Sequence, residues 1–302
     1  MSNLPSSPRV IFSKKYGHVN ILWSLVKWPI LNILLRKSRE YVVNKKQLVV
    51  FSFDYIGHCI NLEGIFENKD LETVFDWLKQ YKGSFDGTAI DIGANIGNHS
   101  LYFSDFYNKV VSFEPNMRTF KVLALNVELA KNIECYNFGI SSSNGNAEMH
   151  VNKTNMGGSF ISTDPSLTSQ SITLQTLDSV IDDSEVIKLL KVDVEGHDYD
   201  ALLGSENTIK RNMPVILFEQ HDEDFVNGES KVIELLKSYG YSQFAIVQTH
   251  PRVPSYFGFA LQGIYALVGK LIFGESMRII RMTNFAPALY RHIIAIPDWM
   301  DA

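Results

Sequence analysis

The chain has 302 residues, of which 45% are hydrophobic and 20% charged, a composition that excludes a disordered or low-complexity protein. Its net charge of -5 is unevenly distributed, because residues 1–50 hold nine Lys or Arg against one acid (+8), which leaves -13 for residues 51–302. Cys59 and Cys135 lie far apart and without neighbouring metal ligands, which excludes a disulfide framework or a zinc knuckle. We therefore expect a cytoplasmic protein whose two ends meet different partners.

Residues 1–47 are predicted to form a basic amphipathic segment. No cleavable signal peptide is expected, because the first ten residues are polar. Residues 18–36 (HVNILWSLVKWPILNILLR) are rich in Leu, Ile and Trp, but Lys27 and Pro29 interrupt them, so they make a poor membrane span. Two interpretations stay open: a helical hairpin that caps the core, or peripheral binding of residues 14–46 to an anionic membrane surface.

Residues 48–87 are interpreted as a lead-in extension that packs on the core, with a short strand over residues 48–53 and a helix over residues 70–81. A second apolar stretch belongs to an insertion near residues 256–290. Its residues 256–273 carry few strongly polar side chains, so they form either a buried helix or an interfacial one.

From residue 88 to residue 302 the chain alternates short β-branched runs with helical runs, which is typical of a parallel sheet with helices on both faces. Strands are predicted over residues 88–93, 109–115, 133–139, 187–195, 215–220, 243–247 and 292–297, and helices over residues 98–106, 118–130, 199–210 and 229–238. Residues 147–151 and 171–180 interrupt this alternation and are predicted to form an inserted hairpin. The expected fold is α/β: a doubly wound, mostly parallel sheet with an N-terminal extension and an inserted hairpin.

The turn after the first strand, DIGANIGNHS (91–100), lies where ligands bind in a doubly wound sheet. Gly93 and Gly97 permit a tight turn, but Asp91 stands in place of the first glycine of the dinucleotide fingerprint and would repel a pyrophosphate. A carboxylate there attracts the ammonium or sulfonium group of S-adenosylmethionine. Glu114, at the end of the second strand, can accept hydrogen bonds from ribose hydroxyls. The two acids therefore favour S-adenosylmethionine over a nicotinamide dinucleotide.

Several stretches of the chain together resemble the FkbM-type family of S-adenosylmethionine-dependent methyltransferases. They are DIGANIGNHSLYFS, VVSFEPN, ITLQTLDSVI, IKLLKVDVEGHDYDALLGSENTI and VILFEQH, and the resemblance covers about residues 62–221. It implies a seven-strand, Rossmann-like methyltransferase sheet and methylation of a hydroxyl oxygen, often on a sugar, a polysaccharide or a small natural product. The expected cofactor site comprises Asp91, Gly93, Asn95, Gly97, Asn98, Glu114 and Asp193.

A second group of acids, in KVDVEGHD (191–198), ends the fourth strand. Asp193 and Glu195 are expected on one side of the extended chain, where a sulfonium cofactor would balance their charge. Methyl transfer to a hydroxyl also benefits from a base, and His197 and His221 are the candidates for it because imidazole titrates near neutrality. Glu195 is expected to orient the cofactor or the substrate, and the resemblance implies that Glu219 binds the acceptor hydroxyl or serves as the base itself. A divalent ion on these strand ends is a minor alternative, because the spacing matches no known metal motif.

The sequence therefore predicts an O-methyltransferase for a hydroxyl of a glycan, a glycolipid or a related natural product, held near an anionic membrane by its basic head. Two other classes stay open: an RNA or other nucleic-acid methyltransferase or binding protein that uses the same head, and a non-catalytic protein that binds S-adenosylmethionine. The acidic body opposes the nucleic-acid class. The retained acids Asp91, Glu114, Asp193 and Glu195 oppose the non-catalytic class. The identity of the acceptor and the oligomeric state stay open.

Overall fold

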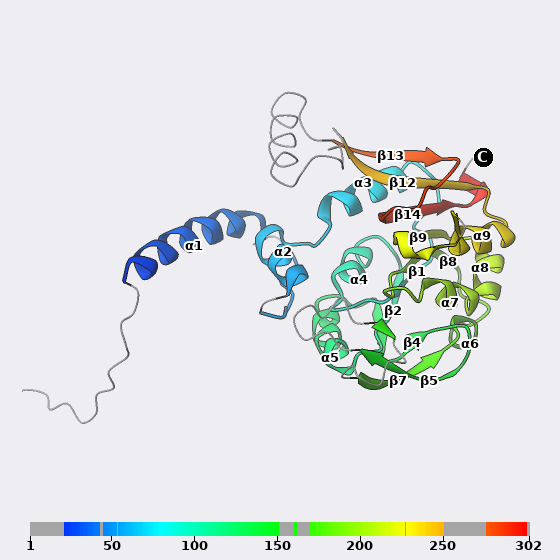
Figure 1. The fold of residues 1–302 in the computed structure, drawn as a ribbon, viewed down its shortest axis with the longest axis horizontal. Coiled ribbons are helices and arrows are strands. Elements are labelled where there is room, and N and C mark those ends of the chain that lie inside the picture. Colours follow the sequence, from blue (N-terminus) through cyan, green and yellow to red (C-terminus); the bar gives the residue numbers. More distant parts are fainter. Residues whose placement is uncertain are drawn as a thin grey trace, which may run out of the picture.

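The computed structural model describes residues 21–42, 45–52, 54–150, 160–161, 169–226, 228–250 and 276–300, whose arrangement Figure 1 shows. The helices in these ranges are α1 (Ile21–Val42), α2 (Tyr55–Glu63), α3 (Asn68–Leu78), α4 (Asn98–Phe103), α5 (Met117–Asn126), α6 (Leu177–Val180), α7 (Asp198–Leu203), α8 (Glu206–Asn212) and α9 (Lys231–Ser238). The predicted apolar segment 256–273 lies outside the described residues.

An eight-stranded sheet forms the centre of the molecule. In spatial order its strands are β13 (Ser276–Met282), β12 (Gln243–His250), β14 (Tyr290–Ile296), β9 (Val215–Gln220), β8 (Ile187–Val192), β1 (Thr88–Ile92), β2 (Lys109–Phe113) and β3 (Ile133–Tyr136). Strands β3, β2, β1, β8 and β9 are parallel, whereas β14, β12 and β13 pair antiparallel with their neighbours. The chain leaves β1 toward β3 and returns on the other side of β1 as β8, so the strand order reverses between β1 and β8. This topology confirms the doubly wound, mostly parallel α/β fold.

The seven-strand prediction is one strand short, because β13 adds an eighth strand at the edge of the sheet. β13 falls within the predicted insertion near residues 256–290, and it pairs with β12 from Phe244–Met282 to His250–Ser276. Arg278 and Arg281 interrupt its apolar residues, so it lacks the continuous apolar run of a central strand. Charged side chains of this kind are typical of an edge strand.

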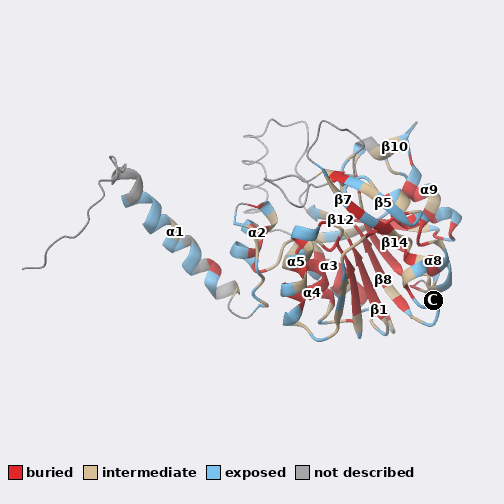
Figure 2. Ribbon diagram, turned by 90° about the horizontal axis from the view of Figure 1, so that it is seen from below, coloured by how far each residue is buried: buried red, intermediate tan, exposed pale blue. Residues whose placement is uncertain are grey.

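Strand β1 shows how the sequence divides the core into two layers. All five of its residues are buried. Ile90 and Ile92 pack in the cluster that contains α7, α8 and α9, whereas Ala89 packs in the cluster that contains α3 and α4. Figure 2 shows these buried strands between helices whose outer faces are exposed. Because side chains alternate along a strand, Asp91 shares the face of Ala89 and points toward α4.

The segment before β1 differs from the prediction at residues 48–52, which form no strand. Instead, the side-chain amide of Asn126 in α5 pairs with Val49 in both directions. Its Oδ1 accepts the backbone N–H of Val49 at 2.7 Å, and its Nδ2 donates to the backbone oxygen of Val49 at 2.9 Å. The amide thus satisfies the backbone groups that a neighbouring strand would otherwise bond.

The predicted helical hairpin is also wrong for the described part of residues 18–36. There α1 is a single helix of 22 residues that extends away from the sheet (Figure 1). Apolar residues surround this helix instead of lining one face of it, so it has no defined face to pack on the core.

The inserted strands pair antiparallel, as predicted, within a separate four-stranded sheet. This sheet contains β4 (Gly139–Ile140), β5 (Gly145–His150), β6 (Phe160–Ile161) and β7 (Ser169–Gln175), and a short ribbon forms from β10 (Phe225–Val226) and β11 (Glu229–Ser230). The strand predicted over residues 171–180 stops at Gln175, because the following residues form α6. The Asp178 carboxylate in α6 accepts the backbone N–H groups of Asn207 and Thr208 at 2.9 and 2.8 Å, which caps α8.

The helix predicted over residues 199–210 is divided into α7 and α8. The division falls at Gly204, where an added Cβ would lie 1.9 Å from the backbone oxygen of Ser141. The backbone of the inserted sheet therefore approaches this point too closely for a side chain.

Candidate active site

A cavity of about 490 Å³ lies at the carboxyl ends of the central strands, beside the point where the strand order reverses. Side chains of α2 and of the segment before α3 cover it from the other side. Eight of the residues predicted for the site line this cavity: Gly93, Asn95, Asn98, Glu114, Asp193, Glu195, His197 and Glu219. Three do not, and these are Asp91, Gly97 and His221.

The turn after β1 is held in an unusual backbone conformation. Gly93 has a φ of 77°, and a Cβ at this position would lie 1.9 Å from the backbone oxygen of Asp193. Only glycine fits such an approach. Asn95 also has a positive φ, of 50°, and its backbone N–H donates to Glu114 Oε2 at 3.0 Å. The turn is therefore fixed against both β8 and the end of β2.

Glu114 is positioned by backbone donors on both carboxylate oxygens. Asn95 donates to Oε2, and the backbone N–H of Asn116 donates to Oε1 at 2.8 Å. Burial raises the pKa of Glu114 to about 7, although these two hydrogen bonds lower it. Each oxygen keeps a further acceptor position, so this carboxylate can bind hydroxyl groups in the cavity.

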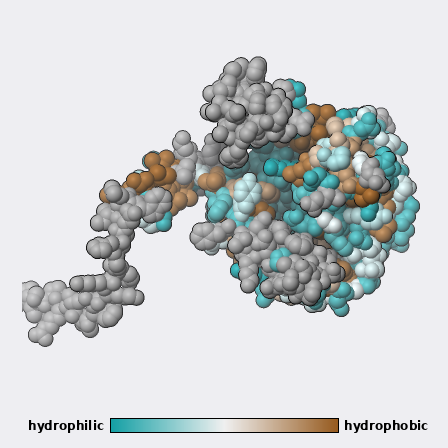
Figure 3. Space-filling view, in the orientation of Figure 1, coloured by the Kyte–Doolittle hydropathy of each residue, from teal (hydrophilic) through white to brown (hydrophobic). Residues whose placement is uncertain are grey.

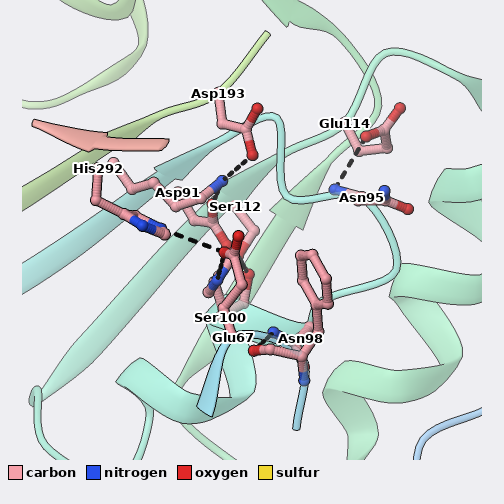
Figure 4. Close-up of polar contacts among 12 residues, drawn as sticks. Glu67, Asp91, Asn95, Asn98, Ser100, Ser112, Glu114, Asp193 and His292 are labelled. Carbon is pink, nitrogen blue, oxygen red and sulfur yellow. Dashed lines mark hydrogen bonds and ion pairs between the residues drawn. The ribbon is translucent and has the colours of Figure 1, made fainter. Parts of the chain in front are cut away.

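Asp91 lies beneath the turn in a buried polar network, which Figure 4 shows. Its Oδ2 accepts the hydroxyl of Ser100 at 2.6 Å, and Ser112 donates to Ser100 at 2.8 Å. Its Oδ1 lies 3.2 Å from Nζ of Lys191, which also lies 3.2 Å from Asp193 Oδ2. Burial lowers the pKa of Lys191, but the attraction of Asp193 and Asp91 outweighs it and raises that pKa well above its usual range.

The role predicted for Asp91 therefore changes. It is fully buried outside the cavity lining and its charge is balanced by Lys191, so in this structure it stabilises the turn. Gly97, which begins α4, has a φ of 92° and packs against Leu123, where an added Cβ would lie 2.8 Å from Cδ1. The side-chain amide of Asn98 bonds the backbone of Phe66 at both ends. Its Oδ1 accepts the N–H of Phe66 at 2.9 Å, and its Nδ2 donates to the backbone oxygen of Phe66 at 3.0 Å. It thereby fixes the segment that covers the cavity.

Glu195 and Glu219 bring two more carboxylates to the opposite side of the cavity from Glu114. Asp193 and Glu195 are predicted to share one side of an extended strand, but β8 already ends at Val192, so the two residues do not lie in an extended strand. Glu195 instead has a φ of 48°, an uncommon conformation for a residue with a side chain. Partial burial, together with the charges of Asp193 and Glu219, raises the pKa of Glu195 to about 7. Burial also raises the pKa of Glu219, and the negative charge of Asp193 raises it further.

The two predicted histidines lie in different surroundings. His197 lines the cavity at the start of α7, where its Nε2 is 2.9 Å from the hydroxyl of Ser141. Burial lowers the pKa of His197, although Asp200 acts in the opposite direction. His221 lies outside the cavity lining, with its Nε2 3.7 Å from Glu219 Oε1. Of the two, His197 is therefore the one that lines the cavity.

The sequence reasoning missed a cluster around Glu67. Glu67 has a φ of 58° at the start of α3, and its Oε2 lies 3.3 Å from Nε2 of His99 and 3.2 Å from Nε2 of His292. Burial raises the pKa of Glu67, but the bonds from the two histidines outweigh it and hold that pKa far below its usual range. Asp70 lies 3.7 Å from Nδ1 of His292. The cluster ties α3, α4 and β14 together at the wall of the cavity (Figure 4).

Two further observations bear on possible ligands. No group of three or more His, Cys, Asp or Glu side chains in the described ranges could hold a metal ion. Among the described residues, the Lys and Arg side chains that line the cavity are those of Lys191 and Arg291, and Lys191 is paired with two carboxylates. Arg291, in β14, is exposed and has no ion-pair partner within the ranges that the structure covers.

A glycine turn at the switch point, a carboxylate at the end of β2 and acids after β8 together define a Rossmann-like methyltransferase. Residues 91–242, about half of the chain, match the family model described as the methyltransferase FkbM domain. The chain belongs to this family, and it is a methyltransferase.

Three known proteins illustrate the similarity. The hexuronic acid methyltransferase AglP of Haloferax volcanii is 30% identical over 167 residues, which cover 53% of this chain and 68% of AglP. The crystal structure of an FkbM methyltransferase from Methylobacillus flagellatus is 18% identical with a TM-score of 0.36, covering 65% of this chain but only 50% of that one. A precorrin-6y C5,15-methyltransferase from Geobacter metallireducens is 13% identical with a TM-score of 0.35, covering 74% and 88% of the two chains.

Proposed function

We propose that this protein transfers the methyl group of S-adenosylmethionine to an oxygen atom of a sugar-type acceptor. The observation that carries the proposal is the division of the cavity into two sides. On one side, the turn after β1 fixes Glu114 as an acceptor of hydroxyl groups. On the other side, Asp193, Glu195 and Glu219 concentrate negative charge. A cofactor that carries two ribose hydroxyls and a positive charge fits both sides.

The residues present fit this cofactor. Glu114 would hold the ribose hydroxyls, because its two oxygens are already oriented by Asn95 and Asn116. Asp193 would lie near the ammonium or sulfonium charge, since its partner Lys191 offsets only part of the local negative charge. When bound, S-adenosylmethionine supplies the electrophilic methyl group.

Binding of S-adenosylhomocysteine should weaken as the pH falls below about 7. Hydroxyl donors bind the ionised form of Glu114, and the pKa of this carboxyl is raised to about 7, so at lower pH binding must first remove a proton. The dependence should approach about tenfold in Kd per pH unit, and Glu114→Gln should reduce it. Isothermal titration between pH 5.5 and 8.5 measures both. An equally steep dependence in Glu114→Gln would assign the proton to another group.

The acceptor is proposed from the relative and from one side chain. AglP is described as acting on hexuronic acid, a sugar that carries a carboxylate. Arg291 lies at the wall of the cavity without an ion-pair partner in the described structure, and a guanidinium can bind a carboxylate through two hydrogen bonds. We therefore assign Arg291 to the acceptor's carboxylate, which leaves a hydroxyl of the sugar to face Glu195 and Glu219.

Arg291→Ala should raise KM for a uronic acid glycoside by about tenfold to 100-fold, because a charge-assisted contact contributes about 1.5–3 kcal/mol. It should leave KM for the matching neutral hexoside unchanged. Arg278→Ala, on the edge strand β13, serves as the control. The assay measures S-adenosylhomocysteine formation with glucuronide and glucoside acceptors. Equal effects of Arg291→Ala on both acceptors would contradict the assignment.

Alkali treatment of the methylated product identifies the oxygen that accepts the methyl group. A methyl ether on a hydroxyl survives mild alkali, whereas a methyl ester on the carboxylate is hydrolysed. If Arg291 binds the carboxylate, the product is the alkali-stable ether. An alkali-labile product would show that the carboxylate itself is the acceptor, and failure of both sugars as acceptors would refute the proposed function.

A further inference from the structure

The outer part of α1 exposes large apolar side chains that nothing in the described structure covers. Among its residues with described side chains, Leu25 is 64%, Val26 48%, Trp28 60%, Ile30 53%, Ile33 61% and Leu35 46% exposed. Figure 3 shows the resulting hydrophobic surface along this helix, away from the main body. An exposed apolar surface of this kind marks a site of interaction.

We propose that α1 inserts into one leaflet of an anionic lipid membrane and holds the methyltransferase at that surface. This inference does not depend on which acceptor the enzyme uses. Residues 21–35 are the part that enters the lipid, because Lys27 is the only charged residue among them. The basic residues that follow then lie at the level of the headgroups.

The distribution of the apolar side chains favours lipid over a protein partner. A groove on a protein, or a second copy of the helix, covers one stripe of a helix. At 100° per residue, Leu25, Ile30 and Leu35 lie on different sides of α1, and all three are at least 46% exposed. Lipid chains surround an inserted helix and cover every side of it.

The charge of the molecule complements an anionic surface. Lys27, Arg36 and Arg39 are exposed on α1, and residues 1–50 carry +8, whereas residues 51–302 carry -13. An acidic body would be repelled by anionic lipid if it lay flat on it. Because α1 extends away from the sheet (Figure 1), the helix can enter the membrane while the body stays at a distance.

The length of the apolar part limits how deep it reaches. Residues 21–35 form about 22 Å of helix, which is shorter than the roughly 30 Å hydrocarbon core of a bilayer but longer than the roughly 15 Å of one leaflet, so α1 enters that leaflet at a steep tilt to the membrane normal. No helix in the described part of the chain is long and apolar enough to cross a membrane. The long side chain of Lys27 can extend its ammonium group to the headgroups.

Sedimentation of the full-length protein with vesicles tests the proposal. Vesicles of phosphatidylcholine alone are compared with vesicles of phosphatidylcholine and phosphatidylglycerol in equal parts, at low and high salt. The apolar variant is Leu25→Ser, Trp28→Ser, Ile33→Ser, and the charge variant is Arg36→Glu, Arg39→Glu. Their matched controls on the body are Leu125→Ser, Val186→Ser, Leu289→Ser, whose side chains are 49%, 50% and 53% exposed, and Lys121→Glu, Lys131→Glu.

The wild-type chain should bind the anionic vesicles, and brominated lipid should quench its tryptophan fluorescence, by a smaller amount in Trp28→Phe because Trp23 is the other tryptophan of the inserted part. The apolar variant should bind at least about tenfold more weakly. The charge variant should lose about tenfold or more in affinity for the anionic vesicles and most of its salt dependence. Both controls should match the wild type. Absence of wild-type binding, or equal binding by the apolar variant, would overturn the proposal. The proposal would also be overturned if the wild-type chain formed an oligomer that does not bind vesicles and the apolar variant were monomeric, since α1 would then bind protein.

Discussion

Lys191→Met should lower the free energy of unfolding by about 3–5 kcal/mol, because it leaves the buried carboxylate of Asp91 without a counter-ion. Asp91 is fully buried, and Lys191 is 6% exposed. Nζ of Lys191 lies 3.2 Å from both Asp91 and Asp193, so one substitution removes both ion pairs. Denaturation in urea, followed by circular dichroism, measures the loss.

The double variant Asp91→Asn, Lys191→Met should recover most of this stability, because it removes the buried charge together with its partner. Lys210→Met provides the control, since its exposed pair with Glu206 on α8 is expected to contribute less than about 1 kcal/mol. A loss in Lys191→Met no larger than in Lys210→Met would show that Asp91 does not need Lys191.

Glu195→Gln should lower kcat by about 10²–10⁴-fold, the usual contribution of a general base. Glu195 lines the cavity, and its pKa is raised to about 7, near the pH at which a base works best. Its carboxylate would take the proton of the acceptor hydroxyl. In the wild type, kcat should rise with pH until it levels off above about pH 7, because only the ionised carboxylate accepts a proton. Steady-state kinetics at saturating acceptor, from pH 5.5 to 9, measures the profile.

Three controls separate this role from a structural one. Glu195→Gln should still bind S-adenosylhomocysteine, which lacks the sulfonium charge, and its pH profile should lose the rise below pH 7. Glu229→Gln, on the exposed ribbon strand β11, should keep the wild-type kcat. If instead Glu219→Gln or His197→Asn abolishes turnover while Glu195→Gln keeps it, the base is one of those side chains.

Much of the fold could be predicted because short-range patterns determine it. The apolar run of β1 and the glycines after it mark a buried parallel strand and its turn, and both appear where the sequence places them. The errors come from partners distant in the sequence. Residues 48–52 have the composition of a strand, but Asn126, 77 positions away, bonds both backbone groups of Val49. The edge strand β13 depends on pairing with β12, which its own composition does not encode.

The site was predictable to the extent that its residues stand at strand ends. Glu114, Asp193, Glu195 and Glu219 all follow or end central strands, and all line the cavity. Lys191 could have been found, since a lysine beside the buried apolar residues of β8 needs a buried partner. The cluster of Glu67, His99 and His292 had no local signal, because it joins three segments that only the fold brings together.

The assignment of the cavity to S-adenosylmethionine is tested most directly by titration of the purified protein with S-adenosylhomocysteine, in parallel for the wild type, Glu114→Ala and the control Glu134→Ala on the neighbouring strand β3. The wild type and Glu134→Ala should bind equally, and Glu114→Ala should bind about 10- to 100-fold more weakly, since it loses charge-assisted hydrogen bonds to hydroxyls. NADH should not bind. Equal affinity in Glu114→Ala, or no binding of S-adenosylhomocysteine by the wild type, would contradict the assignment of the cavity to this cofactor.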